Sequence, residues 1–215
     1  MCSSISSTNN NNTMLQPFFM PDITEVGVDE AGRGALAGPV AAAAVVLPEK
    51  FSNTLLNDSK QLTAKQREEL RSVIINEALA WGVALVPESV IDEINILNAS
   101  ILAMHNALDI VSNKLKFQHI IVDGNRFKPY CDVPFTTIVK GDAKYMSIAA
   151  ASIIAKTERD RYMQKLHDEY PCYDWNKNMG YPTKKHRSAI EEFGPSRYHR
   201  MSFQLLKPKE LSLFE

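Results

Sequence analysis

Residues 26–34 have the sequence VGVDEAGRG, which joins a short apolar strand to two adjacent acidic residues and a glycine-rich turn. Valine favours extended backbone, and the GRG segment predicts a tight turn after the strand. A run of small and β-branched residues at 40–46 predicts a second strand that pairs with the first. This stretch therefore places Asp29 and Glu30 together at the end of a buried strand.

The rest of the chain alternates apolar strands with helical segments, which is typical of a mixed α/β fold. The expected strands lie at 81–86, 120–122 and 135–139, and the expected helices at 63–80, 98–114, 143–169 and 183–193. Small residues at 149–152 would let the third of these helices pack closely against a sheet. We therefore predict a mixed sheet flanked by helices.

Composition favours a globular protein of ordinary charge. The chain has 215 residues, of which 45% are hydrophobic and 23% charged, and its formal net charge is −1. This length fits one large domain, or one domain with an appendage. Overall basicity is excluded as a way of binding nucleic acid, so any such surface has to come from local clustering. The scattered Cys2, Cys131 and Cys172 argue against disulfides or a structural zinc site and favour the reducing cytoplasm.

The two ends of the chain differ from its middle. Residues 1–18 begin with a Ser/Asn-rich tract that cannot bury apolar area, so we expect disorder there. Residues 19–175 are expected to form the main domain and residues 176–207 a basic helical extension, because eight basic residues and only two acidic ones lie between 176 and 209. Residues 208–215 are expected to form a flexible tail. No apolar run looks long enough to cross a membrane, and the N-terminus has no secretory pattern.

Acidic side chains follow three of the expected strands. Asp29 and Glu30 follow the first, and Asp123 and Asp142 follow two later ones. Because strand ends in an α/β sheet gather at one edge, the four carboxylates are expected to converge. Converging anions repel unless a cation lies among them, and carboxylate oxygens suit Mg²⁺ or Mn²⁺ rather than zinc. The alternative is that each acid merely begins a turn, and the pattern alone leaves both interpretations open.

Gly32, Arg33 and Gly34 form the glycine turn, for which two interpretations also exist. One is a tight turn with a solvated arginine; the other is a loop whose backbone approaches a sugar-phosphate, since glycine removes side-chain obstruction. A dinucleotide-binding fingerprint is disfavoured, because the spacing to Gly38 is wrong and Pro39 stands where a helix would begin. A P-loop is excluded because its Gly-Lys-Ser/Thr ending is missing.

Together with further blocks, these residues resemble the ribonuclease HII (type 2 ribonuclease H) family. The blocks occur in the family's order and span about residues 26–206. They are VDEAGRG at 28–34, LAGPV at 36–40, NDSK at 57–60, VDGN at 122–125, VKGD at 139–142, AAASIIAK at 149–156, GYPT at 180–183 and HRMSF at 199–203. Ala35 stands where the family often has proline, which should alter stiffness and not chemistry.

The resemblance implies a ribonuclease H-like fold with a C-terminal helical extension. It implies an endonuclease that depends on Mg²⁺ or Mn²⁺ and hydrolyses the RNA strand of RNA–DNA hybrids. It further implies cleavage at single ribonucleotides embedded in duplex DNA, leaving a 3′-hydroxyl and a 5′-phosphate. By the same resemblance, Asp29, Glu30, Asp123 and Asp142 are the catalytic, metal-binding carboxylates.

The resemblance also assigns residues to the substrate. The glycine turn at 32–34 corresponds to a loop that senses the 2′-hydroxyl, the group that separates ribo- from deoxyribonucleotides. Tyr181 corresponds to a ring that packs on the sugar of the adjoining deoxynucleotide, whereas pattern alone would make it a turn residue. Lys60 and Lys156 are candidate phosphate contacts, although most lone lysines are simply solvated.

The C-terminal sequence ELSLF at 210–214 resembles the short peptides that dock on the bacterial replication clamp. Leu211, Leu213 and Phe214 would supply the apolar contacts. Glu210 replaces the usual glutamine, and the alternative is a terminal turn packed on its own domain.

Two other functions remain open on the sequence alone. A non-catalytic module could bind RNA–DNA hybrids, although such a binder gains nothing from four anions beside a phosphate. An integrase-like phosphotransferase of the same fold is disfavoured by the glycine turn and Tyr181. Nothing in the sequence suggests more than a monomer.

Overall fold

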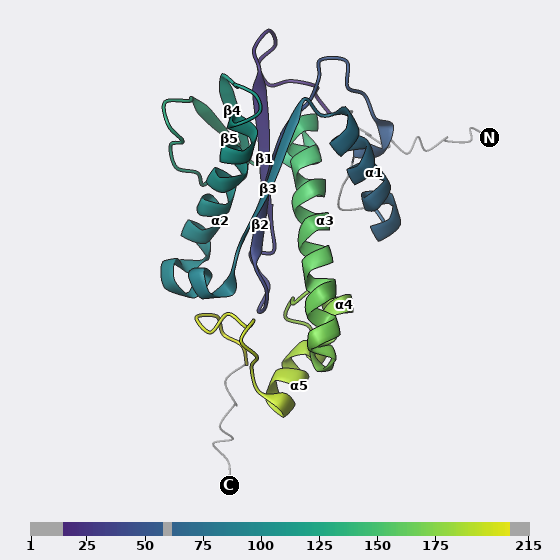
Figure 1. Ribbon diagram of the computed structural model, residues 1–215, viewed down its shortest axis with the longest axis vertical. Helices are drawn as coiled ribbons and strands as arrows, with labels where there is room; N and C mark the ends of the chain where they lie inside the picture. The colour runs from purple at the N-terminus through teal and green to yellow at the C-terminus, as the bar shows by residue number, and fades with distance from the viewer. Residues whose placement is uncertain (1–14, 58–61, 207–215) are drawn as a thin grey trace, which may run out of the picture.

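The computed structural model describes residues 15–57 and 62–206 and centres on one five-stranded sheet (Figure 1). The strands lie in the order β3-β2-β1-β4-β5, so the first hairpin occupies the middle of the sheet. Their bounds are β1 (Glu25–Ala31), β2 (Val40–Val46), β3 (Ala80–Val86), β4 (His119–Asp123) and β5 (Phe135–Ile138).

Helices cover both faces of this sheet, which confirms the expected mixed α/β architecture. Figure 1 shows α2 on one side of the strands and α3 with α1 on the other, with α4 and α5 at the far end of α3. The helices are α1 (Ala64–Glu77), α2 (Glu88–Ser112), α3 (Met146–Glu169), α4 (Trp175–Asn178) and α5 (Lys184–Phe193), with short 3-10 turns η1 (Thr54–Asn57), η2 (Gly141–Ala143) and η3 (Pro171–Tyr173).

Strand direction decides where the carboxylates meet. β1 and β2 form the expected antiparallel pair, with Gly27 opposite Val45. β4 runs parallel to β1, and β5 runs parallel to β4. Because these three neighbouring strands point the same way, their carboxyl ends lie at one edge of the sheet, where ligands bind in open α/β sheets.

Small residues bring the sheet and α3 close together. β2 is buried along its whole length and contributes alternate residues to the two faces of the sheet. Ala149, Ala150 and Ala151 present a small surface from α3 to this sheet. On β1, a Cβ atom placed at Gly27 would lie 2.3 Å from the Ser147 carbonyl carbon of α3. Glycine is therefore required where the β1 backbone meets the start of α3.

The long helix α2 differs from the expected helix at 98–114 by beginning ten residues earlier. Asn95 interrupts it with φ 65° and ψ 163°, and its side-chain oxygen accepts hydrogen bonds from the Leu97 and Asn98 amides at 3.0 and 3.1 Å. Asn95 thus caps the part of α2 that the sequence predicts. The segment from Glu88 to Ile94 was missed because its apolar residues Val90, Ile91 and Ile94 span only about two helical turns, too short a stretch to predict a helix from periodicity.

By length and composition, α2 is long and apolar enough to cross a membrane. No such segment was expected from the sequence. Its apolar residues instead pack on the sheet, with Ala103, Ala107 and Leu108 fully buried there. The break at Asn95 also divides it into two shorter pieces. We therefore assign α2 as a core helix.

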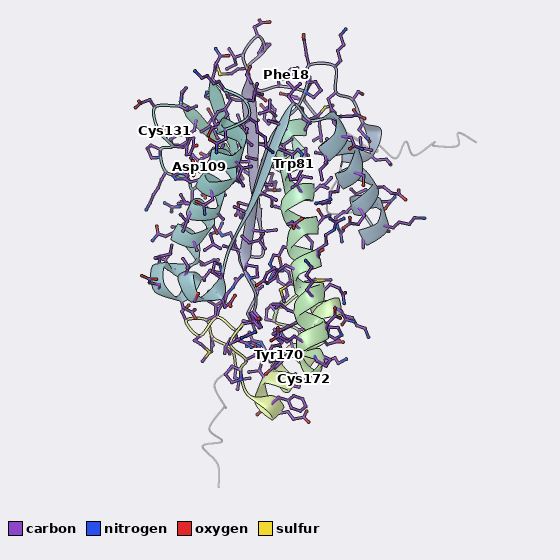
Figure 2. All side chains as sticks on the ribbon, in the orientation of Figure 1. Phe18, Trp81, Asp109, Cys131, Tyr170 and Cys172 are labelled. Atoms are coloured by element: carbon purple, nitrogen blue, oxygen red, sulfur yellow. The ribbon has the colours of Figure 1, made fainter. Side chains whose placement is uncertain are left out.

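Both ends of the described chain are tied to the main domain. Leu15 is buried, and the Gln16 amide donates to the Lys144 carbonyl at 2.7 Å, so the packed chain begins before the expected limit at Phe18. At the other end, Tyr170 lies where α3 meets the C-terminal helices (Figure 2). It adjoins a cluster that includes Leu36, Met163, Trp175 and Ile190. The extension expected from residue 176 therefore shares a core with the residues before it.

The contact between β1 and α3 yields a stability prediction. We expect Gly27→Ala to lower the free energy of unfolding by about 1–3 kcal/mol or more, because the added methyl group overlaps the α3 backbone. Thermal unfolding followed by circular dichroism measures the change. Gly34→Ala is the matched control, since a Cβ there meets no atom within 4 Å. Equal unfolding temperatures for the two variants would contradict the proposed close contact.

Candidate active site

A cleft of about 380 Å³ opens at the carboxyl edge of β1, β4 and β5. All four expected carboxylates line it, together with Gly32, Lys156 and Tyr181. The full lining is Asp29, Glu30, Ala31, Gly32, Arg67, Asp123, Asp142, Ser152, Ile153, Lys156 and Tyr181. The structure thus brings together acids that are separated by more than a hundred residues in the chain.

Each carboxylate owes its place to the strand that carries it. Asp29 and Glu30 lie inside β1, two residues and one residue before its end, and not after the strand as the sequence suggested. Pairing of Glu30 and Ala31 with β2 extends the strand this far. Asp123 is the last residue of β4, and Asp142 lies in η2, just after β5. Alternation along β1 sends Asp29 and Glu30 to opposite faces, so they reach the cleft from two sides of the sheet edge.

The protein only partly offsets the energetic cost of burying these like charges. Asp29 is 5% exposed, and its Oδ1 accepts a hydrogen bond from the Glu30 amide at 2.7 Å. Burial raises the pKa of Asp29 well above its ordinary value, and the charges of Glu30 and Asp123 raise it further. Burial also raises the pKa of Glu30, while the Arg33 guanidinium at 3.1 Å opposes that shift. The cleft therefore favours an added positive charge.

The donor set fits a hard divalent cation. Glu30 Oε2 is buried and has no hydrogen-bond partner among the described residues. Side chains of the described segments nevertheless include no group of three potential ligands already arranged around one point. Glu30 is turned towards Arg33, and Asp123 Oδ1 accepts from the Gly141 amide at 2.6 Å. Coordination by Asp29, Glu30, Asp123 and Asp142 would therefore require one or more of these side chains to turn towards the ion.

The glycine turn borders the cleft through Gly32. Its φ of +92° favours glycine, and a Cβ atom there would lie 2.0 Å from Arg159 Nε. Arg33 is about half exposed and pairs with Glu30. Gly34 has open space on its Cβ side, which leaves its backbone accessible to a ligand. Arg33 and Gly34 adjoin the cleft lining without forming part of it.

Two cations and a hydroxyl complete the cleft. Lys156 Nζ lies 2.6 Å from Asp160 Oδ1, one turn along α3. Arg67 from α1 and Ser152 from α3 also line the cleft, although the sequence had not marked them as site residues. Arg67 has no sequence signal, because a charged residue on a surface helix is ordinary. Lys60 lies outside the described residues, as do the tail residues Leu211, Leu213 and Phe214.

The Tyr181 turn rests on a buried histidine pair. His186 Nδ1 lies 2.9 Å from the Tyr181 carbonyl oxygen, and His186 Nε2 lies 3.0 Å from Trp175 Nε1 and 3.1 Å from His199 Nε2. The Ser196 amide donates to His199 Nδ1 at 2.9 Å. With both rings neutral, the protons lie on His186 Nδ1 and His199 Nε2, and the lone pair of His186 Nε2 is shared between the Trp175 and His199 donors.

Comparison with protein families identifies a match over most of the chain. The family model described as ribonuclease HII matches residues 26–206. A ribonuclease HII of Bacteroides thetaiotaomicron is 63% identical over 200 residues, which cover 93% of this chain and 99% of that protein.

Solved structures agree with this match. The ribonuclease H2 of Pyrococcus horikoshii superimposes with a TM-score of 0.71 at 30% identity, covering 85% of this chain and 95% of that one. The ribonuclease HII in the complex with PCNA from Archaeoglobus fulgidus has the same TM-score at 26% identity, covering 89% of this chain and all of that one. The ribonuclease H-like fold is thereby confirmed.

The histidine pair yields a pH prediction. Burial and the adjacent His186 lower the pKa of His199 from 6.5 to about 4. The unfolded chain therefore binds a proton that the folded protein excludes between these values, so stability present above pH 6.5 is lost as the pH falls to 4. We expect His199 to account for about 3 kcal/mol of that loss.

Denaturant unfolding at several pH values, with His199→Gln as the comparison, measures this contribution. The variant keeps an N–H directed at His186 but cannot take up the proton, so its stability should fall less on acidification. Identical pH profiles for the two proteins would show that His199 titrates normally.

Proposed function

The chain belongs to the ribonuclease HII family and is a ribonuclease H endonuclease, and we propose that its four clustered carboxylates form the catalytic metal site. Enzymes of this family act on RNA–DNA hybrids and depend on divalent metal ions. The observation that carries the proposal is the convergence of Asp29, Glu30, Asp123 and Asp142 on one cleft beside the glycine turn and Tyr181. A non-catalytic hybrid-binding module is thereby set aside.

Mg²⁺ or Mn²⁺ is the cation class that these oxygen ligands favour. Divalent ions held there would activate the attacking water and stabilise charge on the departing oxygen. The carboxylates of the chain supply the negative charge that attracts the ions, while Arg67 and Lys156 supply positive charge at the same cleft. These two cations are placed to attract the phosphodiester, so that the substrate does not approach an exclusively anionic surface.

We propose in addition that the enzyme cuts at single ribonucleotides embedded in duplex DNA, leaving a 3′-hydroxyl and a 5′-phosphate. The support is the arrangement of groups able to recognise one sugar. The open backbone at Gly34 can form short-range hydrogen bonds to a 2′-hydroxyl. The half-buried Tyr181 ring on the cleft wall offers a flat face to a neighbouring sugar, where an added hydroxyl would crowd it.

Cleavage of a duplex containing one ribonucleotide tests this proposal. The wild-type protein should cut it with Mg²⁺ or Mn²⁺ and should bind without cutting when a chelator is present. Asp29→Asn should lower the cleavage rate at least about 100-fold, a loss of about 3 kcal/mol of transition-state stabilisation. Its unfolding temperature should be unchanged or higher in chelator, because one buried like charge is removed.

Asp132→Asn provides the matched control, because Asp132 is exposed on the loop between β4 and β5, apart from the cleft lining. It should cut at the wild-type rate. A wild-type rate for Asp29→Asn would refute the assignment of that carboxylate, and the position of the product band shows on which side of the ribonucleotide the strand is cut.

We also propose that the tail containing Leu211, Leu213 and Phe214 docks on a replication sliding clamp. The support is the sequence ELSLF, together with the Archaeoglobus fulgidus relative whose structure is a complex with PCNA. Three apolar side chains close together in the sequence suit a shallow apolar pocket. The cytoplasmic location and the monomeric state expected from the sequence stay predictions.

Deletion of residues 211–215 tests the clamp proposal. We expect full-length protein to retain purified clamp in a pull-down and the truncated protein to lose it, because the apolar contacts are removed. Cleavage of a short duplex without clamp should be the same for both proteins. Equal retention of the clamp would refute docking through this tail.

A further inference from the structure

Two arginines are buried beside the cleft without an ion-pair partner. Arg159 of α3 is 1% exposed, and Arg200 after α5 is 0% exposed. Within the described part of the chain, neither guanidinium has a carboxylate within 4.0 Å. Arg200 is one of the eight basic residues counted for the expected basic extension, and its burial removes it from the exposed charge of that extension. Burying a cation without an anion is costly, so these side chains require another source of stabilisation.

Backbone carbonyls of the loop after β1 stabilise the two buried guanidinium groups. Arg159 donates from Nε to the Pro39 carbonyl at 2.9 Å and from Nη2 to the Ala37 carbonyl at 3.0 Å. Arg200 donates from Nε to Gly38, from Nη1 to Arg33 and from Nη2 to Pro39, each at 3.0 Å. The two guanidinium groups together hold three consecutive carbonyls of this loop, at residues 37–39, and the carbonyl of Arg33 in the glycine turn.

Arg159 also ties this loop to the turn that carries Tyr181. Its Nη1 donates to the Met179 carbonyl at 2.8 Å, and its guanidinium lies 5.4 Å from the centre of the Tyr181 ring. The Leu36 amide donates to the Gly180 carbonyl at 2.7 Å, next to the same junction. One side chain thus contacts the glycine turn at Gly32, the following loop and the tyrosine turn.

The guanidinium fork explains why arginine occupies both positions. Its planar donors reach several carbonyls at fixed angles, whereas a lysine ammonium is a compact charge on a flexible stem. Burial lowers the pKa of both groups, and burial together with the nearby charge of Arg159 lowers that of Arg200 to about 9. Both side chains therefore remain cations at neutral pH, and a neutral buried side chain of this length would lose the charge-assisted hydrogen bonds.

We propose that Arg159 and Arg200 are positioning residues for ribonucleotide recognition, which hold the glycine turn and Tyr181 at one fixed separation. This inference rests on the proposed recognition of the ribose by those two segments. Recognition of a single hydroxyl depends on backbone groups held within a few tenths of an ångström. A loop released from its guanidinium bonds would still bind a phosphate backbone but would distinguish ribose from deoxyribose less well.

Binding of two duplexes by full-length protein tests the proposal. One duplex carries a single ribonucleotide and the other is the same sequence in DNA throughout, and fluorescence anisotropy in chelator at one salt concentration gives both Kd values. The ratio of the Kd for the DNA duplex to the Kd for the ribonucleotide duplex measures the preference for ribose. We expect Arg159→Lys and Arg200→Lys to lower this ratio at least fivefold, with the Kd for the DNA duplex changed less than twofold. A role confined to stability would leave this ratio unchanged in folded protein.

Arg161→Lys is the matched control, because Arg161 lies on the same helix and forms an exposed ion pair with Glu68. Its ratio should stay within twofold of the wild-type ratio. A wild-type ratio in folded Arg159→Lys and Arg200→Lys overturns the inference. A wild-type protein that binds both duplexes equally refutes ribose recognition itself, so the two failures are distinguishable.

Circular dichroism decides which variants are measured. If one of the two lysine variants does not fold, the other alone decides the outcome. If neither folds, hydrogen exchange of the wild-type protein decides it. We then expect the Leu36 and Gly38 amides, which donate to Gly180 and Tyr198, to exchange as slowly as amides of β1. Exchange at the rate of an open loop overturns the inference.

Discussion

Parallel pairing of β4 with both β1 and β5 is the constraint on which the rest of this structure depends. It forces strand ends from distant parts of the chain to one edge of the sheet, and each of those ends brings a carboxylate. Water would screen the repulsion between such charges, yet Asp29 and Asp142 are buried. The fold therefore holds a concentration of negative charge that isolated strands would not tolerate, and a bound cation would relieve the repulsion.

Two kinds of packing hold the cleft in shape against this repulsion. On one side, β1 and the start of α3 approach closely because glycine occupies the contact at Gly27, and the alanines of α3 pack on the same sheet. Close-packed interiors transmit rather than absorb small displacements, so the cleft has a rigid floor. On the other side, the C-terminal extension wraps the loop after β1 and shares an apolar cluster with Leu36 and Met163. The extension is therefore part of the wall of the cleft.

The sequence predicted the parts of this arrangement that have a local or periodic signal. Apolar runs located the five strands, and acids at strand ends indicated the carboxylate cluster. The helices expected at 63–80 and 183–193 both exist, and Thr63 and Thr183 cap their first turns through the side chain. The missed features depend on tertiary contact. Arg159 and Arg200 look like surface cations in the sequence, because nothing local reveals that the loop after β1 will fold over them.

The cleft can bind cations because its carboxylates do not form ion pairs with the two buried arginines. Four carboxylates and two buried guanidinium groups border the same glycine turn, and ordinary electrostatics would pair them. The structure directs the donors of Arg159 and Arg200 to carbonyl oxygens, which satisfies the cations without consuming an anion. Among the four acids only Glu30 has an arginine partner within 4.0 Å in the described segments, and that residue, Arg33, is about half exposed.

An exposed partner exchanges readily with solvent or ligand, whereas a buried carboxylate–arginine pair would neutralise the cleft permanently. Burying the arginines under the loop therefore serves the acids as well, since it removes the strongest competing cations from their reach.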